Sequence, residues 1–129
     1  MPGFETLAAV RVVASPAALD AASMPGGSFA LRIAPDEVLV VGTDAPAVAG
    51  DPHAIIVADH GFSGRWFSPD DFATTVKPHI EWVLPTVRPA LAQGLIAAVP
   101  AKVWFADDAV LVLCHSAYAD ELTSRLGGR

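Results

Sequence analysis

The sequence is poor in cysteine and lysine, and it contains no long apolar run. Its single cysteine, Cys114, excludes an internal disulfide and any multi-cysteine zinc or iron–sulfur site. Its two lysines, Lys77 and Lys102, stand far apart, so the clustered cations that neutralise nucleic-acid phosphates are missing. No segment approaches the ~20 apolar residues of a membrane helix, and the first residues lack the basic region of a signal peptide. We therefore expect a cytoplasmic protein that binds neither nucleic acid nor membranes.

The composition is that of a folded, acidic domain. Of 129 residues, 53% are hydrophobic and 17% are charged, and 8 Lys and Arg against 14 Asp and Glu give a net charge of −6. This is enough apolar material for a core, and the length fits one domain. Within 1–129 we expect a less regular N-terminal segment at 1–24, a linker at 25–28 and a main body at 29–129.

Capping and turn signals divide the chain into short helices and paired strands. Ser15-Pro16 and Ser68-Pro69 are typical helix starts, because serine caps the first amides and proline at the first helical position loses no hydrogen bond. The expected elements are a helix over 15–23, strands 29–33 and 38–41 in a hairpin, a strand over 54–58, a helix from Ser68 that ends before Pro78, strands 99–105 and 110–114 in a hairpin, and a last helix capped by Ser116 and stopped at Gly127. Residues 78–98 receive no assignment. The pattern predicts an α+β fold: a single domain with an antiparallel sheet of paired hairpins and two or three short helices.

Polar and aromatic side chains concentrate between residues 53 and 82. The segment 59–66 places a carboxylate, an imidazole and a guanidinium around two glycines, directly after an expected strand. Binding loops often lie at such strand ends, and a guanidinium such as that of Arg65 can clamp a carboxylate. One hypothesis is therefore a ligand pocket formed by Asp59, His60, Arg65, Trp66, His79 and Trp82. The alternative is a glycine-rich turn with solvated polar residues, in which Phe62 or Trp66 enters the core.

Catalytic motifs are weak. Asp59, His60 and Ser63 include the residue types of a nucleophilic triad, but residues 61–64 are one residue short of a Gly-x-Ser-x-Gly elbow. Imidazole and carboxylate suit zinc or non-haem iron, yet the spacing of the candidate ligands matches no named motif; these are His53, His60, His79 and Glu81. We therefore expect no catalytic residue and no metal site in the isolated chain. A small metal-assisted or hydrolytic enzyme remains an alternative.

Three segments, 31–42, 88–104 and 116–122, carry a pattern known from one family. In the first, a Pro-Asp-Glu turn joins two apolar strands. In the second, a strand bearing Lys102 and Trp104 is expected to pair with an apolar strand. In the third, a small residue, an aromatic residue and an alanine stand at the start of the last helix. Together, over about half of the chain, they resemble the small gamma subunit of heterotetrameric sarcosine oxidases and the related folate-binding T-protein superfamily of glycine cleavage.

This resemblance implies an accessory subunit without catalytic residues. Such a chain packs against larger flavin- and folate-carrying subunits that oxidise an N-methyl amine, and it binds neither cofactor itself. The expected partners are therefore larger flavoprotein subunits, or further copies of the chain in a homo-oligomer. The alternative function, which rests on the residues alone, is a small-ligand-binding domain built around Arg65.

Overall fold

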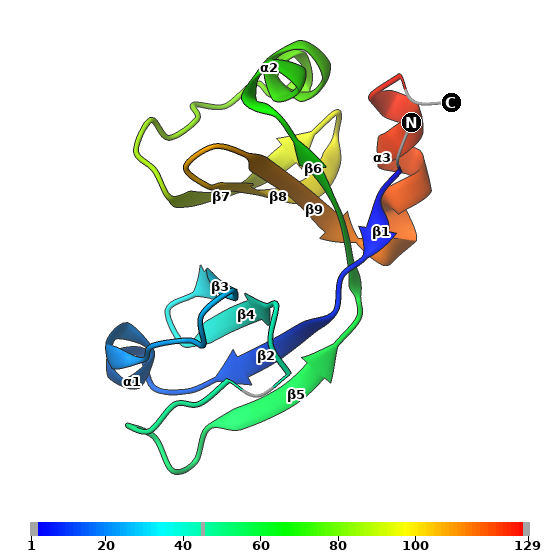
Figure 1. Ribbon diagram of the computed structural model, residues 1–129. Coiled ribbons are helices and arrows are strands. Elements are labelled where there is room, and N and C mark those ends of the chain that lie inside the picture. Colours follow the sequence, from blue (N-terminus) through cyan, green and yellow to red (C-terminus); the bar gives the residue numbers. More distant parts are fainter. Residues whose placement is uncertain (1–2, 45, 128–129) are drawn as a thin grey trace. The chain divides into compact units, whose positions relative to one another are not determined.

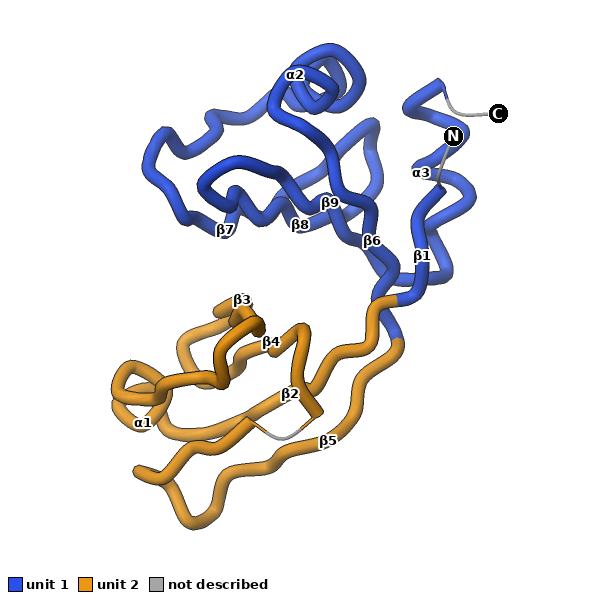
Figure 2. The backbone as a smooth tube through the Cα atoms, viewed as in Figure 1, with its two compact units in different colours: residues 1–6, 61–129 blue, residues 7–60 orange. Residues whose placement is uncertain are grey.

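The computed structural model describes residues 3–44 and 46–127, which divide into two compact units (Figures 1 and 2). One unit contains residues 3–6 and 61–127, and the other contains residues 7–44 and 46–60. The second unit is thus inserted in sequence between the first and second strands of the first. Each unit has its own antiparallel sheet, and all strand pairs are antiparallel. The predicted α+β class is confirmed.

The inserted unit is a four-stranded sheet with one helix. Its elements are β2 (Ala9–Val13), α1 (Pro16–Ala21), β3 (Phe29–Ala34), β4 (Glu37–Val41) and β5 (Ile55–Asp59), and the strand order is β3-β4-β2-β5. The Ser15 hydroxyl accepts a hydrogen bond from the Ala18 amide at 3.3 Å, so the predicted helix cap is confirmed. Valines 10, 12, 38 and 40 of the two central strands pack with Ala18 and Leu19 of α1, which covers one face of the sheet.

The Asp51 carboxylate connects the loop between β4 and β5 to the start of α1. Asp51 accepts hydrogen bonds from the backbone amides of Ser15 and His53, each at 2.8 Å. The Ser15 amide, followed by the His53 amide, holds the pKa of Asp51 below its ordinary value, because both bonds favour the ionised form. The loop therefore meets the start of α1 through a charge-assisted contact.

The other unit is a five-stranded sheet with helical turns on one face. Its strands are β1 (Glu5–Thr6), β6 (Phe62–Phe67), β7 (Ala90–Ile96), β8 (Val99–Phe105) and β9 (Val110–His115), in the order β1-β6-β9-β8-β7. Its helical segments are the α-helices α2 (Pro69–Asp71) and α3 (Ala119–Arg125), the π-helical turn η1 (Phe72–Val76) and the 3₁₀ turns η2 (Lys77–His79) and η3 (Ser116–Tyr118). Gly127 ends the last helix with φ of 85°, as predicted. The predicted cap at Ser116 is absent, because its hydroxyl instead bonds that of Ser63 at 2.8 Å.

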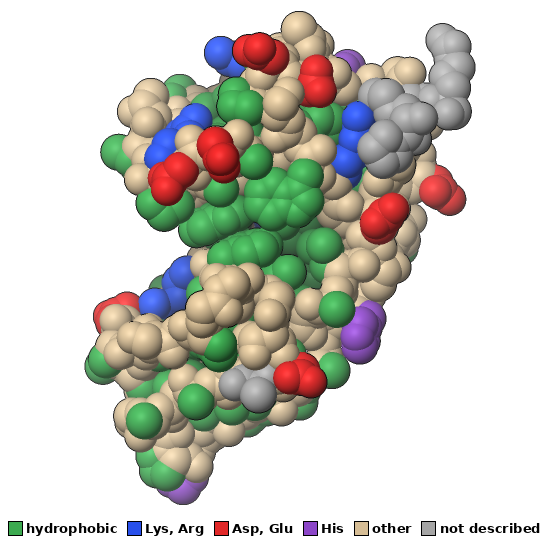
Figure 3. Space-filling model, viewed as in Figure 1, with side chains coloured by type: hydrophobic (Ala, Val, Ile, Leu, Met, Phe, Trp, Pro, Cys, Tyr) green, Lys and Arg blue, Asp and Glu red, His purple; other side chains and the backbone are tan. Residues whose placement is uncertain are grey.

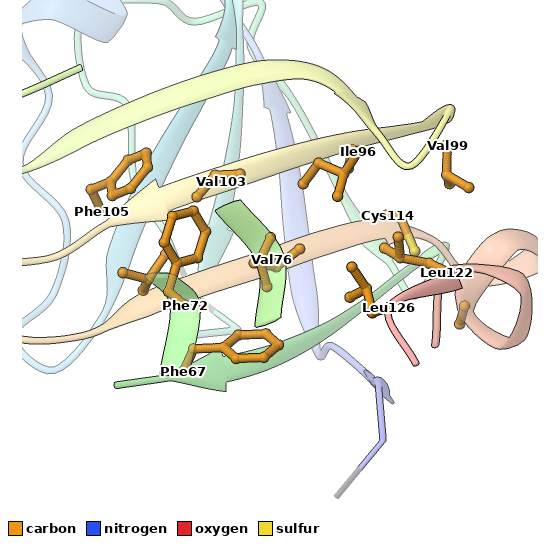
Figure 4. Packing of buried hydrophobic residues seen from close by; sticks show 14 residues of the cluster. Phe67, Phe72, Val76, Ile96, Val99, Val103, Phe105, Cys114, Leu122 and Leu126 are labelled. Atoms are coloured by element: carbon orange, nitrogen blue, oxygen red, sulfur yellow. The ribbon is translucent and has the colours of Figure 1, made fainter. Parts of the chain in front are cut away.

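The core of this unit lies between the sheet and its helical segments (Figure 4). Alternate residues of β8 and β9 point into it, among them Val103 and Phe105. The rings of Phe72 and Phe105 meet edge to face, with centroids 5.5 Å apart. Leu122 of α3 is fully buried on the same face. The helical segments therefore pack against the apolar face of the sheet, which arises because side chains alternate between the two faces along each strand.

The domain boundaries expected from the sequence remain a prediction. In the structure, residues 25–28 connect α1 to β3 inside the inserted unit. No helix of residues 3–44 and 46–127 is long and apolar enough to cross a membrane. On the face seen in Figure 3, basic side chains are scattered singly and form no continuous patch.

The hairpin of β7 and β8 closes through an unusual turn. Ile96 pairs with Val99, so only Ala97 and Ala98 connect the strands, and their φ angles are 49° and 66°. Two-residue hairpin turns with positive φ normally use Asn-Gly or Gly, because a Cβ is disfavoured there. The Ala97 amide donates to the His79 carbonyl at 3.1 Å, and the Ala97 carbonyl accepts from Arg125 Nη1 at 2.7 Å. Contacts from two other segments thus hold the turn in place.

We predict that Ala98→Gly stabilises the protein by about 0.5–1 kcal/mol, because it removes a Cβ from a left-handed backbone position. Urea unfolding measures the change. The matched control is Ala92→Gly in the middle of β7, which is expected to lower stability by about 0.5–1 kcal/mol. If both variants lost stability equally, the turn would not be strained.

Candidate functional site

The predicted pocket residues are distributed over both units. Asp59 and His60 belong to the inserted unit, whereas Arg65, Trp66, His79 and Trp82 belong to the other. The Asp59 carboxylate lies 3.3 Å from Arg11 Nε, in an ion pair between neighbouring strands of its own sheet. His60 is exposed at the end of β5. A binding role for the six residues together stays a prediction.

Arg65 and Trp66 are neighbours on β6 and project from opposite faces of the sheet. Arg65 lies on the same face as Phe67, and its guanidinium stacks over the Phe67 ring at 4.4 Å. Its Nε atom is buried and has no hydrogen-bond partner within the described ranges. Trp66 is exposed. The alternation of the strand therefore separates the two side chains that the sequence placed in one pocket.

His79 and Trp82 are brought together. Both line a cavity of about 590 Å³, whose other walls are Pro78, Glu81, Leu95, Ala97 and Ala98. Trp82 also lines a second cavity, of about 620 Å³. The two predicted residues that meet both belong to segment 78–98, which received no assignment from the sequence.

The Trp82 indole is fixed by a close approach to β7. Its Nε1 donates to the Leu95 carbonyl at 2.8 Å. A Cβ added to Gly94 would lie 2.5 Å from Trp82 Cε2, so the indole occupies the space that any side chain at position 94 would need. Glycine within a strand often marks such an approach. The sequence left segment 78–98 unassigned, so this contact was not predicted.

The 620 Å³ cavity combines an aromatic floor with a cationic edge. Phe72, Phe105 and Val110 are core residues at its base. The remaining lining residues are Pro69, Ala73, Lys77, Ile80, Trp82, Leu84, Pro85, Thr86 and Arg88. Among the described residues, no Asp or Glu lines the cavity. Lys77 and Arg88 were not candidates from the sequence, because isolated cations give no signal there.

Arg88 is held against the base of this cavity. Its guanidinium lies 4.4 Å above the Phe105 ring, a favourable cation–π arrangement. Its Nη1 donates to the carbonyls of Pro85 at 3.1 Å and Val87 at 2.9 Å. Contacts within the protein therefore fix the position of the charged group.

The catalytic alternatives receive no geometric support. Within residues 3–44 and 46–127, no three His, Cys, Asp or Glu side chains gather in a way that could hold a metal ion. Ser63 is buried on β6, and its hydroxyl bonds that of Ser116 at 2.8 Å. Burial raises the pKa of the Cys114 thiol to about 11, so at neutral pH it is a weak nucleophile.

The edge strand β5 exposes a row of apolar side chains. Ile55, Ile56 and Val57 are 58%, 44% and 49% exposed. Among the described strands, β5 pairs only with β2 and so ends the sheet (Figure 1). Proteins usually protect such edges with charge or proline, because an exposed apolar edge invites another strand to pair. This edge has the properties of a protein contact surface.

Comparison with solved structures gives a likeness in fold. No family model matches the sequence, and no curated protein matches it. A chain in the solved structure of heterotetrameric sarcosine oxidase from Corynebacterium sp. U-96 superimposes with a TM-score of 0.72 at 15% identity, over 95% of this chain and 78% of that chain. The fold is that of a sarcosine oxidase subunit. The fold that the sequence resemblance implied is thereby confirmed.

We predict that Gly94→Ala displaces the Trp82 indole and destabilises the protein by about 1–3 kcal/mol, the usual cost of overpacking. A red shift of tryptophan emission, together with urea unfolding, measures the effect. Gly26→Ala is the control, because a Cβ at position 26 meets nothing within 4 Å. Unchanged emission in the Gly94 variant would show that the close approach is unimportant.

The buried thiol predicts a loss of stability in alkali. The unfolded thiol ionises near pH 9.0 and the folded one near pH 11, so burial of Cys114 stabilises the fold fully below pH 9 and less as the pH rises toward 11. Near pH 10 the loss should be about 1 kcal/mol. Urea unfolding at several pH values measures it, and Cys114→Ala supplies the reference. Parallel pH profiles for the two proteins would contradict the prediction.

Proposed function

We propose that this chain is an accessory subunit of a cytoplasmic oxidoreductase complex that acts on N-methyl amines, without catalytic residues of its own. The observation that carries the proposal is the fold, which over 95% of the chain matches a subunit of a heterotetrameric oxidase. In the proposed complex, larger partner chains hold the flavin and folate and perform the oxidation. The resemblance of segments 31–42, 88–104 and 116–122 to the gamma subunit supports the same assignment.

The surface of β5 supports a role in assembly. Its three consecutive exposed β-branched residues are unfavourable in a protein that works alone. A partner strand placed beside β5 would extend the sheet and cover them, as in other cases of strand addition. We place the partner contact at this edge.

Purification from the native cell under mild conditions tests the function. We expect a species much larger than 13.4 kDa, with flavin absorbance and with copurifying chains that oxidise an N-methyl amine. A colourless species of the mass of the chain or of its homo-oligomer would overturn the proposal. That result would favour the ligand-binding alternative.

We predict that Ile55→Lys reduces copurification of the partner chains about tenfold, because a charge on an edge strand opposes strand addition. Native mass and the flavin content of the purified material measure the change. Val83→Lys is the control, since Val83 is 94% exposed in the other unit and lies outside any strand. If both variants lost the partner chains equally, or if neither lost them, β5 would not be part of the interface.

A further inference from the structure

The 620 Å³ cavity carries two cations without a carboxylate partner, in a chain that has an excess of acid. Arg11, Arg32 and Arg125 are each ion-paired with Asp or Glu. Lys77 and Arg88 have no such partner within the described part of the chain, although the net charge is −6. Unpaired cations that converge on one cavity favour the binding of an anion there.

The hydrogen-bonding groups of Arg88 indicate the shape of that anion. Nη1 is occupied by the carbonyls of Pro85 and Val87. The Nε and Nη2 edge has no acceptor among the described residues. That edge presents two parallel N–H groups, which match the two oxygens of a carboxylate. Stacking on Phe105 keeps the guanidinium plane in place. Binding of a ligand would therefore cost little conformational entropy at the Arg88 side chain.

The rest of the lining indicates an apolar ligand body. Trp82 and Leu84 form walls beside the buried rings of Phe72 and Phe105. A volume of about 620 Å³ falls within the range of about 300–1,000 Å³ typical of sites for small organic ligands. Aromatic walls of this kind bury an apolar body while a few polar groups orient it.

We propose that this cavity binds a small amphipathic carboxylate, with the carboxylate at Arg88 and Lys77 and the apolar body against Phe72 and Trp82. This site lies within one unit, and the argument for it does not depend on the accessory-subunit function. It also differs from the pocket predicted around Arg65, with which it shares only Trp82.

Calorimetric titration of the full chain tests the proposal with two probe acids, naphthalene-2-carboxylate and decanoate. We expect at least one of them to bind with one-to-one stoichiometry, and its uncharged amide to bind about tenfold more weakly, because a charge-assisted bidentate contact is lost. Equal affinity of the acid and its amide, or no binding of either acid at millimolar concentration, would overturn the proposal.

Variants of the two cations locate the site. Arg88→Gln should weaken binding of the acid about tenfold, and Lys77→Gln less, because an ammonium cannot make the two-pronged contact of a guanidinium. Arg88→Lys keeps the charge but removes the two-pronged contact, so its affinity should be intermediate. The matched control is Lys102→Gln, since Lys102 projects from the opposite face of the same sheet and bonds Gln93. Equal effects of the Lys77 and Lys102 substitutions, or none from Arg88→Gln, would place binding elsewhere.

Discussion

The packing of the Trp82 indole on the backbone of Gly94 is the contact on which the placement of segment 80–88 of the larger unit depends. Because the ring lies where a side chain at position 94 would be, and donates to the Leu95 carbonyl, it ties the segment after η2 to the edge strand β7. That segment continues to Arg88, whose guanidinium rests on Phe105. One aromatic contact therefore separates two cavities and helps to define the cationic edge of the larger one.

Most elements whose signals are local could be predicted from the sequence. The caps at Ser15 and Ser68 act on amides three residues away, and both form as expected. The hairpin of β3 and β4 likewise follows from a turn encoded between its strands. The hairpin of β7 and β8 could not be predicted, because an Ala97-Ala98 turn has no sequence signature. The turn depends instead on hydrogen bonds with Arg125 and His79, which are distant from it in sequence.

The candidate site was less predictable than the fold, and for a related reason. Clustering in sequence suggested one pocket, but strand alternation sends Arg65 and Trp66 to opposite faces of β6. Asp59 is paired with Arg11 across the neighbouring strand. The cavity that does contain cations is assembled from separated stretches between Pro69 and Val110, so no short window of the sequence contains its pattern.

The insertion of one unit into the other has a consequence for synthesis on the ribosome. β1 pairs with β6 through Thr6 and Ser63, yet the whole inserted unit lies between them in sequence. The four strands of that unit are therefore complete before the partner of β1 has been translated. The inserted sheet can form as the chain emerges, whereas the N-terminal strand must wait for β6. Strand pairs close both sides of the junction, Ala9 with Asp59 in the inserted sheet and Thr6 with Ser63 in the other, so the two ends of the insertion are held together once β6 has formed.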